Sequence, residues 1–142
     1  MPHESAPRHA HRRSRAAAGH TYPYLVLTNT GTAPCTLTGY QGVSFVGDGN
    51  GTQLGAAAAR EAGGVPVVTL TLAPSASAHS QLSIATAANY DAATCRPKQA
   101  DGLRVYPPDQ TQALFVATTA YTACQSTTVA LLQVRPPQAG AA

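Results

Sequence analysis

Short apolar runs separated by turn residues constrain the fold of this chain more than any other feature. The stretch from Leu25 to Tyr40 sets the pattern: an apolar strand, the turn residues Asn29-Thr30-Gly31, and a cysteine that leads into the next strand. The 12 glycines and 11 prolines lie between such runs along the rest of the chain, which places turns there. Spacing of roughly ten residues is typical of an all-β sandwich, and the absence of strand–helix alternation argues against a parallel α/β sheet.

The apolar runs predict about seven or eight short antiparallel strands. They fall at Tyr22–Thr30, Gly42–Val46, Thr52–Leu54, Val67–Leu72, Ser77–Ile84, Leu103–Tyr106, Gln112–Val116 and Thr128–Val134, and Cys35–Leu37 forms a further short extended piece. Three tight turns predict hairpins: Asp48-Gly49-Asn50-Gly51, Pro74-Ser75-Ala76 and Pro107-Pro108-Asp109-Gln110. We read the segment Thr86–Lys98 as an irregular crossing connection.

The charge is concentrated at the N-terminus. The net charge is +3, and residues 1–20 supply it with four arginines against Glu4, so the remainder is neutral. This predicts a disordered basic tail over 1–20, one domain over 21–137 and a flexible tail over 138–142. A neutral body without tryptophan is a poor nucleic-acid surface, and no apolar run is long enough for a transmembrane helix or a signal peptide.

The three cysteines are Cys35, Cys95 and Cys124. Cys95 and Cys124 flank the third hairpin, so a disulfide between them is the simplest interpretation. It would close a loop of roughly 30 residues, contribute about 3–4 kcal/mol and indicate an oxidising compartment. Cys35 is then unpaired; the alternative, a Cys35–His79 catalytic pair, lacks a third orienting residue.

Other polar residues allow three functional hypotheses. The first is binding through loops at one end of the sandwich. The second is a metal site formed by His3, His9 and His11 in the tail, and the third is catalysis by Asp48, Asp91, Asp101 or Asp109. Each of these acids sits in turn-forming sequence, which argues against catalysis. The candidate loop residues are Tyr106, Pro107, Pro108, Asp109, Asp48 and Asn50.

Several linked motifs give the chain a family resemblance over about residues 22–135. They are the stretch 27–45, from Leu27-Thr28-Asn29-Thr30-Gly31 to Gly42-Val43-Ser44-Phe45; Leu72-Ala73-Pro74 with Ala78-His79; Asn89-Tyr90 with Cys95-Arg96-Pro97; and Gly102-Leu103-Arg104-Val105-Tyr106-Pro107-Pro108. In this order they resemble the actinobacterial family called domain of unknown function 4232. The resemblance implies an immunoglobulin-like β-sandwich on exported proteins or lipoproteins of the cell envelope, with no catalytic residues.

The resemblance also bears on Cys35. Similar chains carry an earlier cysteine on a first strand, and we expect it to pair with the position of Cys35. In this sequence the basic tail occupies the position of that first strand. We therefore expect the first edge strand, a signal peptide and one disulfide to be missing, which a truncated start would explain.

Together these observations predict a non-catalytic module of the cell envelope. Its expected partner is an envelope protein or a glycan, with no nucleic acid, and we expect no cofactor and no resident metal. Two alternatives stay open. The first is metal binding through the N-terminal histidines, and the second, which ranks lower, is catalysis by turn carboxylates.

Overall fold

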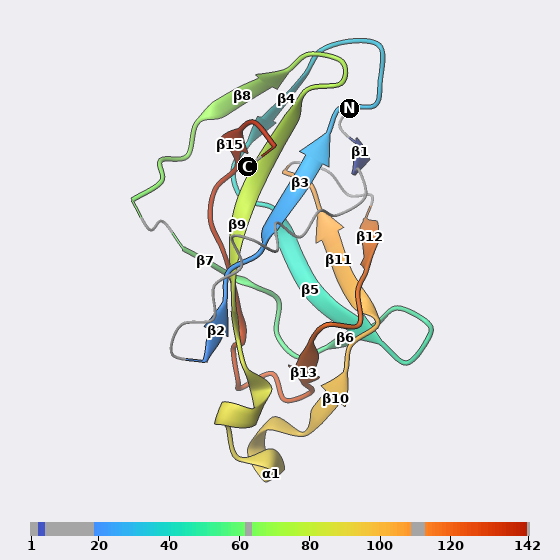
Figure 1. The fold of residues 1–142 in the computed structure, drawn as a ribbon, viewed down its shortest axis with the longest axis vertical. Coiled ribbons are helices and arrows are strands. Elements are labelled where there is room, and N and C mark those ends of the chain that lie inside the picture. The colour runs from blue at the N-terminus through green and yellow to red at the C-terminus, as the bar shows by residue number, and fades with distance from the viewer. Residues whose placement is uncertain (1–2, 5–18, 62–63, 109–112, 142) are drawn as a thin grey trace.

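The computed structural model describes residues 3–4, 19–61, 64–108 and 113–141, and nearly all of its regular structure is strand (Figure 1). The strands are β1 His3–Glu4, β2 His20–Thr21, β3 Tyr24–Thr28, β4 Cys35–Thr38, β5 Gly42–Gly47, β6 Thr52–Leu54, β7 Ala59–Arg60, β8 Thr69–Leu72, β9 Ser77–Ala85, β10 Pro97–Gln99, β11 Gly102–Tyr106, β12 Leu114–Ala117, β13 Thr122–Cys124, β14 Leu132–Val134 and β15 Gln138–Ala139. The helical segments are a 3₁₀ turn, η1 Ala87–Asn89, and α1 Ala92–Cys95. No helix in this described part is long and apolar enough to cross a membrane.

Two larger sheets form the body of the fold. The first has the strand order β1-β3-β9-β14-β7, and β2 and β15 pair with further parts of β9. The second has the order β12-β11-β5-β6, while β4–β8 and β10–β13 form two-stranded sheets. Among the described strands, β14 and β7 are parallel and the other pairs are antiparallel.

The two larger sheets bury one apolar core between them. Side chains alternate between the faces of a strand, so each sheet turns every second residue inward. The inward residues pack in one cluster, with Leu25, Leu82, Ile84, Leu132 and Val134 from the first sheet and Val43, Phe45, Leu103, Val105 and Val116 from the second. The predicted all-β sandwich is therefore confirmed.

Two of the three predicted hairpins are present. The first joins β5 to β6, and Asp48, Gly49 and Gly51 in its turn have positive φ, where glycine avoids a steric penalty. In the third, β11 pairs with β12 and Val105 lies opposite Leu114. Residues 109–112 at its tip lie outside the described residues.

The second predicted hairpin is wrong, because β8 pairs with β4 and not with β9. Asn29 accounts for the difference. Its buried side-chain amide donates hydrogen bonds to the carbonyl oxygens of Leu72 (3.0 Å) and Ala33 (2.9 Å), while its backbone N–H bonds to Ala76 O (2.9 Å). The chain thus leaves β8 and enters β9 in another sheet, and β4–β8 covers a second apolar cluster of Leu27, Cys35, Leu37, Leu72 and Ala78.

Both expected tails contain short strands. The backbone of His3–Glu4 forms β1 and pairs with Leu27 and Thr28 of β3, at the edge where we expected a strand to be missing. Residues 138–142 were expected to be flexible, yet Gln138–Ala139 form β15 against β9. The Nδ1 atom of His79 on β9 lies 3.0 Å from Gly140 O, which adds a polar contact to this pairing.

A buried polar contact links the two layers. Gln41, next to β5, donates a hydrogen bond of 2.7 Å from its Nε2 atom to the Oγ atom of Ser80 on β9. Gln41 is only 2% exposed and Ser80 is fully buried. A buried amide without an acceptor carries its full desolvation penalty, so this hydrogen bond favours the observed alignment of the layers.

We expect Ser80→Ala to lower the free energy of unfolding by about 1–3 kcal/mol, because it removes the acceptor for the buried Gln41 amide. Urea denaturation measures the change. Ser83→Ala is the control, because Ser83 lies on the opposite face of β9. Equal losses in the two variants would contradict a special role for the Gln41–Ser80 contact.

Candidate binding pocket

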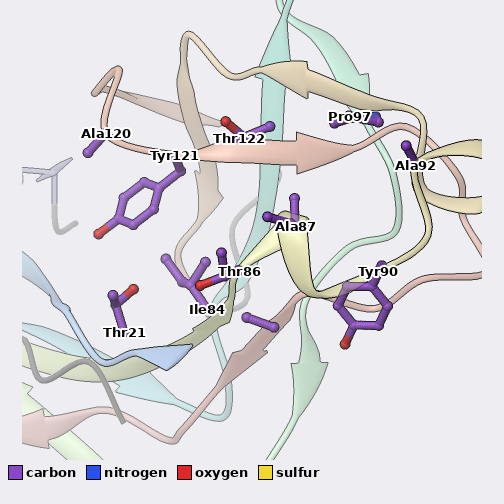
Figure 2. Close-up of a pocket in the computed structure, with 12 residues that line it drawn as sticks. Thr21, Ile84, Thr86, Ala87, Tyr90, Ala92, Pro97, Ala120, Tyr121 and Thr122 are labelled. Atoms are coloured by element: carbon purple, nitrogen blue, oxygen red, sulfur yellow. The ribbon is translucent and has the colours of Figure 1, made fainter. Parts of the chain in front are cut away.

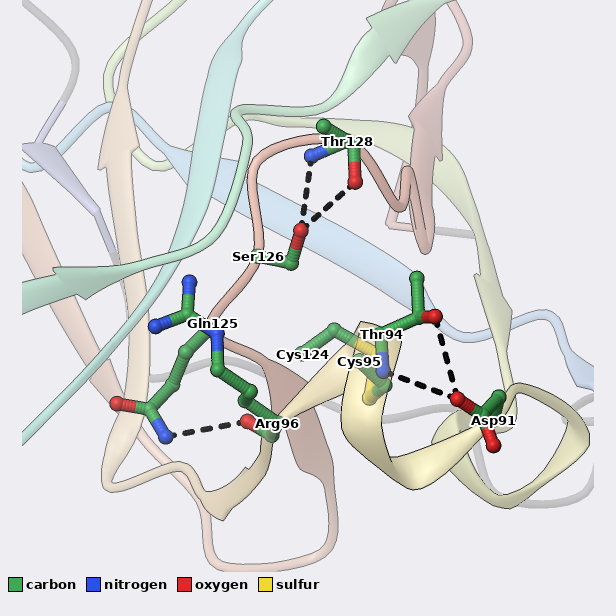
Figure 3. The surroundings of a disulfide bond; sticks show 8 residues. All are labelled: Asp91, Thr94, Cys95, Arg96, Cys124, Gln125, Ser126 and Thr128. Carbon is green, nitrogen blue, oxygen red and sulfur yellow. Dashed lines mark hydrogen bonds between the residues drawn. A yellow bond between two sulfur atoms is a disulfide. The ribbon is translucent and has the colours of Figure 1, made fainter.

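The disulfide predicted between Cys95 and Cys124 is present (Figure 3). Cys95 ends α1 and Cys124 ends β13, and their Cα atoms are 4.7 Å apart. The local backbone favours this approach. Asp91 caps α1 by accepting from the backbone N–H of Thr94 at 3.3 Å, and Arg96 ends the helix in a left-handed conformation with φ of 52°.

Hydrogen bonds extend the bridge into a continuous wall. β10 pairs with β13 in the register Pro97↔Cys124. The side-chain amide of Gln99 on β10 then donates to the carbonyl oxygens of Thr119 (2.7 Å) and Tyr121 (2.9 Å). The segment that enters β13 is therefore attached to the segment that leaves α1.

This wall borders a pocket of about 580 Å³ (Figure 2). Its volume lies within the range of roughly 300–1,000 Å³ that small-molecule sites occupy. The lining comes from β2, the end of β9, η1, α1, β10 and the start of β13. It comprises Thr21, Ile84, Ala85, Thr86, Ala87, Ala88, Tyr90, Ala92, Pro97, Ala120, Tyr121 and Thr122.

The lining is neutral and holds no nucleophile–base pair. Every lining residue is alanine, isoleucine, proline, threonine or tyrosine. Burial raises the pKa of the Tyr121 hydroxyl above its ordinary value of 10.0, and the nearby Thr21 side chain partly offsets the rise. Tyr121 therefore presents a neutral hydroxyl at physiological pH, and Figure 2 shows it directed toward Thr21.

The structure separates the loop residues predicted to form a binding site. Tyr106 is at the end of β11 opposite Gly42, whereas Asp48 and Asn50 are in the turn after the other end of β5. Pro107 and Pro108 are buried, and Asp109 lies outside the described residues. The two loops thus lie at opposite ends of β5 and β11, so the structure does not bring them together as one site.

The described aspartates make structural contacts. Asp48 forms an ion pair with Lys98, Asp91 caps α1, and Asp101 accepts a hydrogen bond of 2.8 Å from the backbone N–H of Gly49. Each of these aspartates thus stabilises a turn or a helix end, as its sequence context indicated.

The cysteine and histidine candidates are separated too. Cys35 is buried against Ala78, whereas the adjacent His79 points to the opposite face of β9, so the two do not form a pair. Only the backbone of His3 is described, and His9 and His11 lie outside the described residues. Within the described part, no group of three metal-ligating side chains occurs.

Sequence reasoning missed the tyrosines of the pocket. Tyr90 is five residues before Cys95 and Tyr121 is three residues before Cys124. Because the predicted disulfide brings the two cysteines together, it also predicts that both tyrosines approach the same end of the sandwich. The spacing of the tyrosines from the cysteines could thus have predicted that both tyrosines belong to one site. The pattern of strands and turns alone does not predict this.

We expect one reactive thiol in the denatured, unreduced protein and three after reduction, because Cys95 and Cys124 are bonded and Cys35 is free. A quantitative thiol assay measures this, and Cys35→Ala should abolish the signal before reduction. Replacing both bonded cysteines by serine should cost about 3–4 kcal/mol of stability. Three reactive thiols without reduction would contradict the bridge.

We expect Tyr121 to ionise above pH 10.0, the ordinary value, because burial raises the pKa of its hydroxyl. The folded protein then keeps this proton while the unfolded chain releases it, so the contribution to stability falls as pH rises past about 10. The tyrosinate absorbance curve of the wild type minus that of Tyr121→Phe isolates this transition. Tyr106→Phe controls for the loss of any one tyrosine, and a midpoint below 10 would contradict the prediction.

Comparison with known proteins identifies a family for this chain. No curated protein and no solved structure matches it. The model of one family, described as a domain of unknown function (DUF4232), matches residues 5–138. The match begins within the segment that we expected to be a tail, before the predicted domain boundary at residue 21. Since it spans nearly all of the 142 residues, the chain belongs to the DUF4232 family.

Proposed function

We propose that this protein is a non-catalytic binding module that takes an uncharged small molecule into the pocket beside the Cys95–Cys124 bridge. The observation that carries this proposal is the neutral pocket of about 580 Å³, which combines apolar walls with hydroxyl groups. An apolar cavity with a few polar groups is the common form of a small-molecule site, because the walls supply affinity and the polar groups orient the ligand.

The chemistry of the lining defines the ligand. A charged ligand would lose its hydration without meeting an opposite charge, which is costly in a half-enclosed apolar site. Threonine and tyrosine hydroxyls donate and accept hydrogen bonds, so they satisfy alcohol, ether or carbonyl groups. An apolar ring or short chain with one or two such groups fits this description.

A binding role without catalysis also fits the polar residues elsewhere. The described aspartates hold turns and a helix end, and the pocket supplies neither a nucleophile nor a general base. Reaction of a bound ligand would require both, together with a group that stabilises developing charge.

We further propose that the module works outside the cytoplasm, in the cell envelope. A disulfide that anchors the pocket wall persists in an oxidising compartment, and the family resemblance points the same way. The immunoglobulin-like connectivity implied by that resemblance remains a prediction.

We expect benzyl alcohol to bind more tightly than benzoate or benzylamine, because the three share a ring and differ in charge. Chemical-shift changes at pocket residues in amide NMR spectra measure binding and its location. The proposal predicts shifts at Ala87, Tyr90 and Thr122. Preferential binding of either charged analogue, or no shift at these residues, would contradict it.

A filling variant makes this test specific. Ala120→Phe places a ring in the pocket and should abolish benzyl alcohol binding while the protein stays folded. Ala57→Phe is the matched control, because Ala57 is exposed and lies outside the pocket lining. If both variants bind benzyl alcohol equally well, the ligand lies elsewhere.

A further inference from the structure

The outward face of the sheet β12-β11-β5-β6 carries two exposed aromatic rings. Leu103 and Val105 of β11 point into the core, so Arg104 and Tyr106 point outward, and Phe115 lies opposite Arg104 on β12. Phe115 is 55% exposed and Tyr106 is 38% exposed. Exposed aromatic rings on one face indicate an interaction surface, and this one is separate from the pocket.

The glycine beneath the Phe115 ring allows this ring to lie close to the sheet. A Cβ atom at Gly102 would come within 2.8 Å of the Phe115 ring, whereas one at Gly42 would make only ordinary van der Waals contact with Tyr106, at 3.5 Å. Tyr106 lies opposite Gly42 and four residues after Gly102 on β11. At about 3.3 Å per residue, the backbone positions beneath the two rings are about 13 Å apart.

A cation lies beside the Tyr106 ring. The Arg104 guanidinium is 6.0 Å from the Tyr106 ring centroid and donates to Gln53 Oε1 (2.6 Å) and Gly51 O (3.3 Å). Both acceptors are neutral. Within the described part of the chain, the ion pairs are Lys98–Asp48 and Arg135–Glu61, so no described carboxylate neutralises Arg104.

We propose that this face binds a linear acidic polysaccharide, with a uronic acid carboxylate at Arg104 and neighbouring sugar rings on Tyr106 and Phe115. Aromatic rings pack against the C–H faces of sugars, and a guanidinium is the preferred partner of a carboxylate. The spacing of the rings suits a segment of a few sugar residues. The Gln53 side chain, beside the guanidinium, can bond to sugar hydroxyls.

The size of the face favours a polysaccharide over a protein partner. Five residues of β11 span about 17 Å, and four strands about 4.8 Å apart make a face of roughly 300 Å². A stable protein interface buries about 800 Å² of accessible surface on each partner, so a protein partner would have to extend well beyond this sheet. A polysaccharide chain needs only a narrow strip, and the rings and the guanidinium provide one.

The test compares polygalacturonate with its methyl ester, which has the same backbone but blocked carboxylates. Isothermal titration calorimetry of the full chain should detect binding to polygalacturonate only, and added salt should weaken it. Arg104→Gln should reduce the affinity about tenfold or more, and Tyr106→Ala or Phe115→Ala about fivefold or more. Phe115→Tyr should bind normally because it keeps the ring.

Two controls distinguish binding at this face from binding at the rest of the protein surface. Thr71→Ala changes an exposed residue of β8, outside this sheet, and should leave binding unchanged. Arg12→Gln with Arg13→Gln tests the basic N-terminal segment, which can attract any polyanion. Thermal melts confirm that each variant is folded. Equal binding of the methyl ester, no binding of polygalacturonate, or loss of binding in the double arginine variant alone would overturn the proposal.

Discussion

Backbone pairing along β9 is the constraint on which the rest of the structure depends. This strand of nine residues pairs with β2 and β14 toward its Ala85 end and with β3 and β15 toward its Ser77 end (Figure 1). Most other strands have two to five residues and bury little surface alone. One long central strand lets them share a ladder, and it also places Ile84 and Ala85 where they form part of the pocket.

The disulfide stabilises a second region, where α1, β10 and β13 are too short to be held by backbone hydrogen bonds alone. β10 and β13 have three residues each, and α1 is a single turn. Such elements gain little from backbone pairing alone, whereas a covalent bridge limits the freedom of the unfolded loop. Together with the Gln99 hydrogen bonds, the bridge holds one wall of the pocket in place. The proposed ligand would therefore bind without the entropic cost of ordering this wall.

The two proposed binding surfaces use different physics. The pocket is neutral and partly enclosed, so it favours an uncharged molecule through burial of apolar surface. The aromatic face is open and holds Arg104, so charge and ring contacts determine what binds there. Because different side chains form them, occupation of one surface leaves the residues of the other available.

The sequence by itself determined the features that depend on near neighbours and one long-range contact, the disulfide, whose two cysteines flank a predicted hairpin. Alternation of apolar residues predicted most strands, Asp48-Gly49-Asn50-Gly51 predicted the first hairpin, and Cys95 and Cys124 predicted their own bridge. Only the tertiary structure decided that β8 pairs with β4, because that pairing depends on the hydrogen bond from Asn29 to Leu72 and on an apolar cluster to which four different strands contribute. The pocket is likewise a tertiary feature: alternation and turn chemistry act within a few residues, whereas its walls come from segments that only packing brings together.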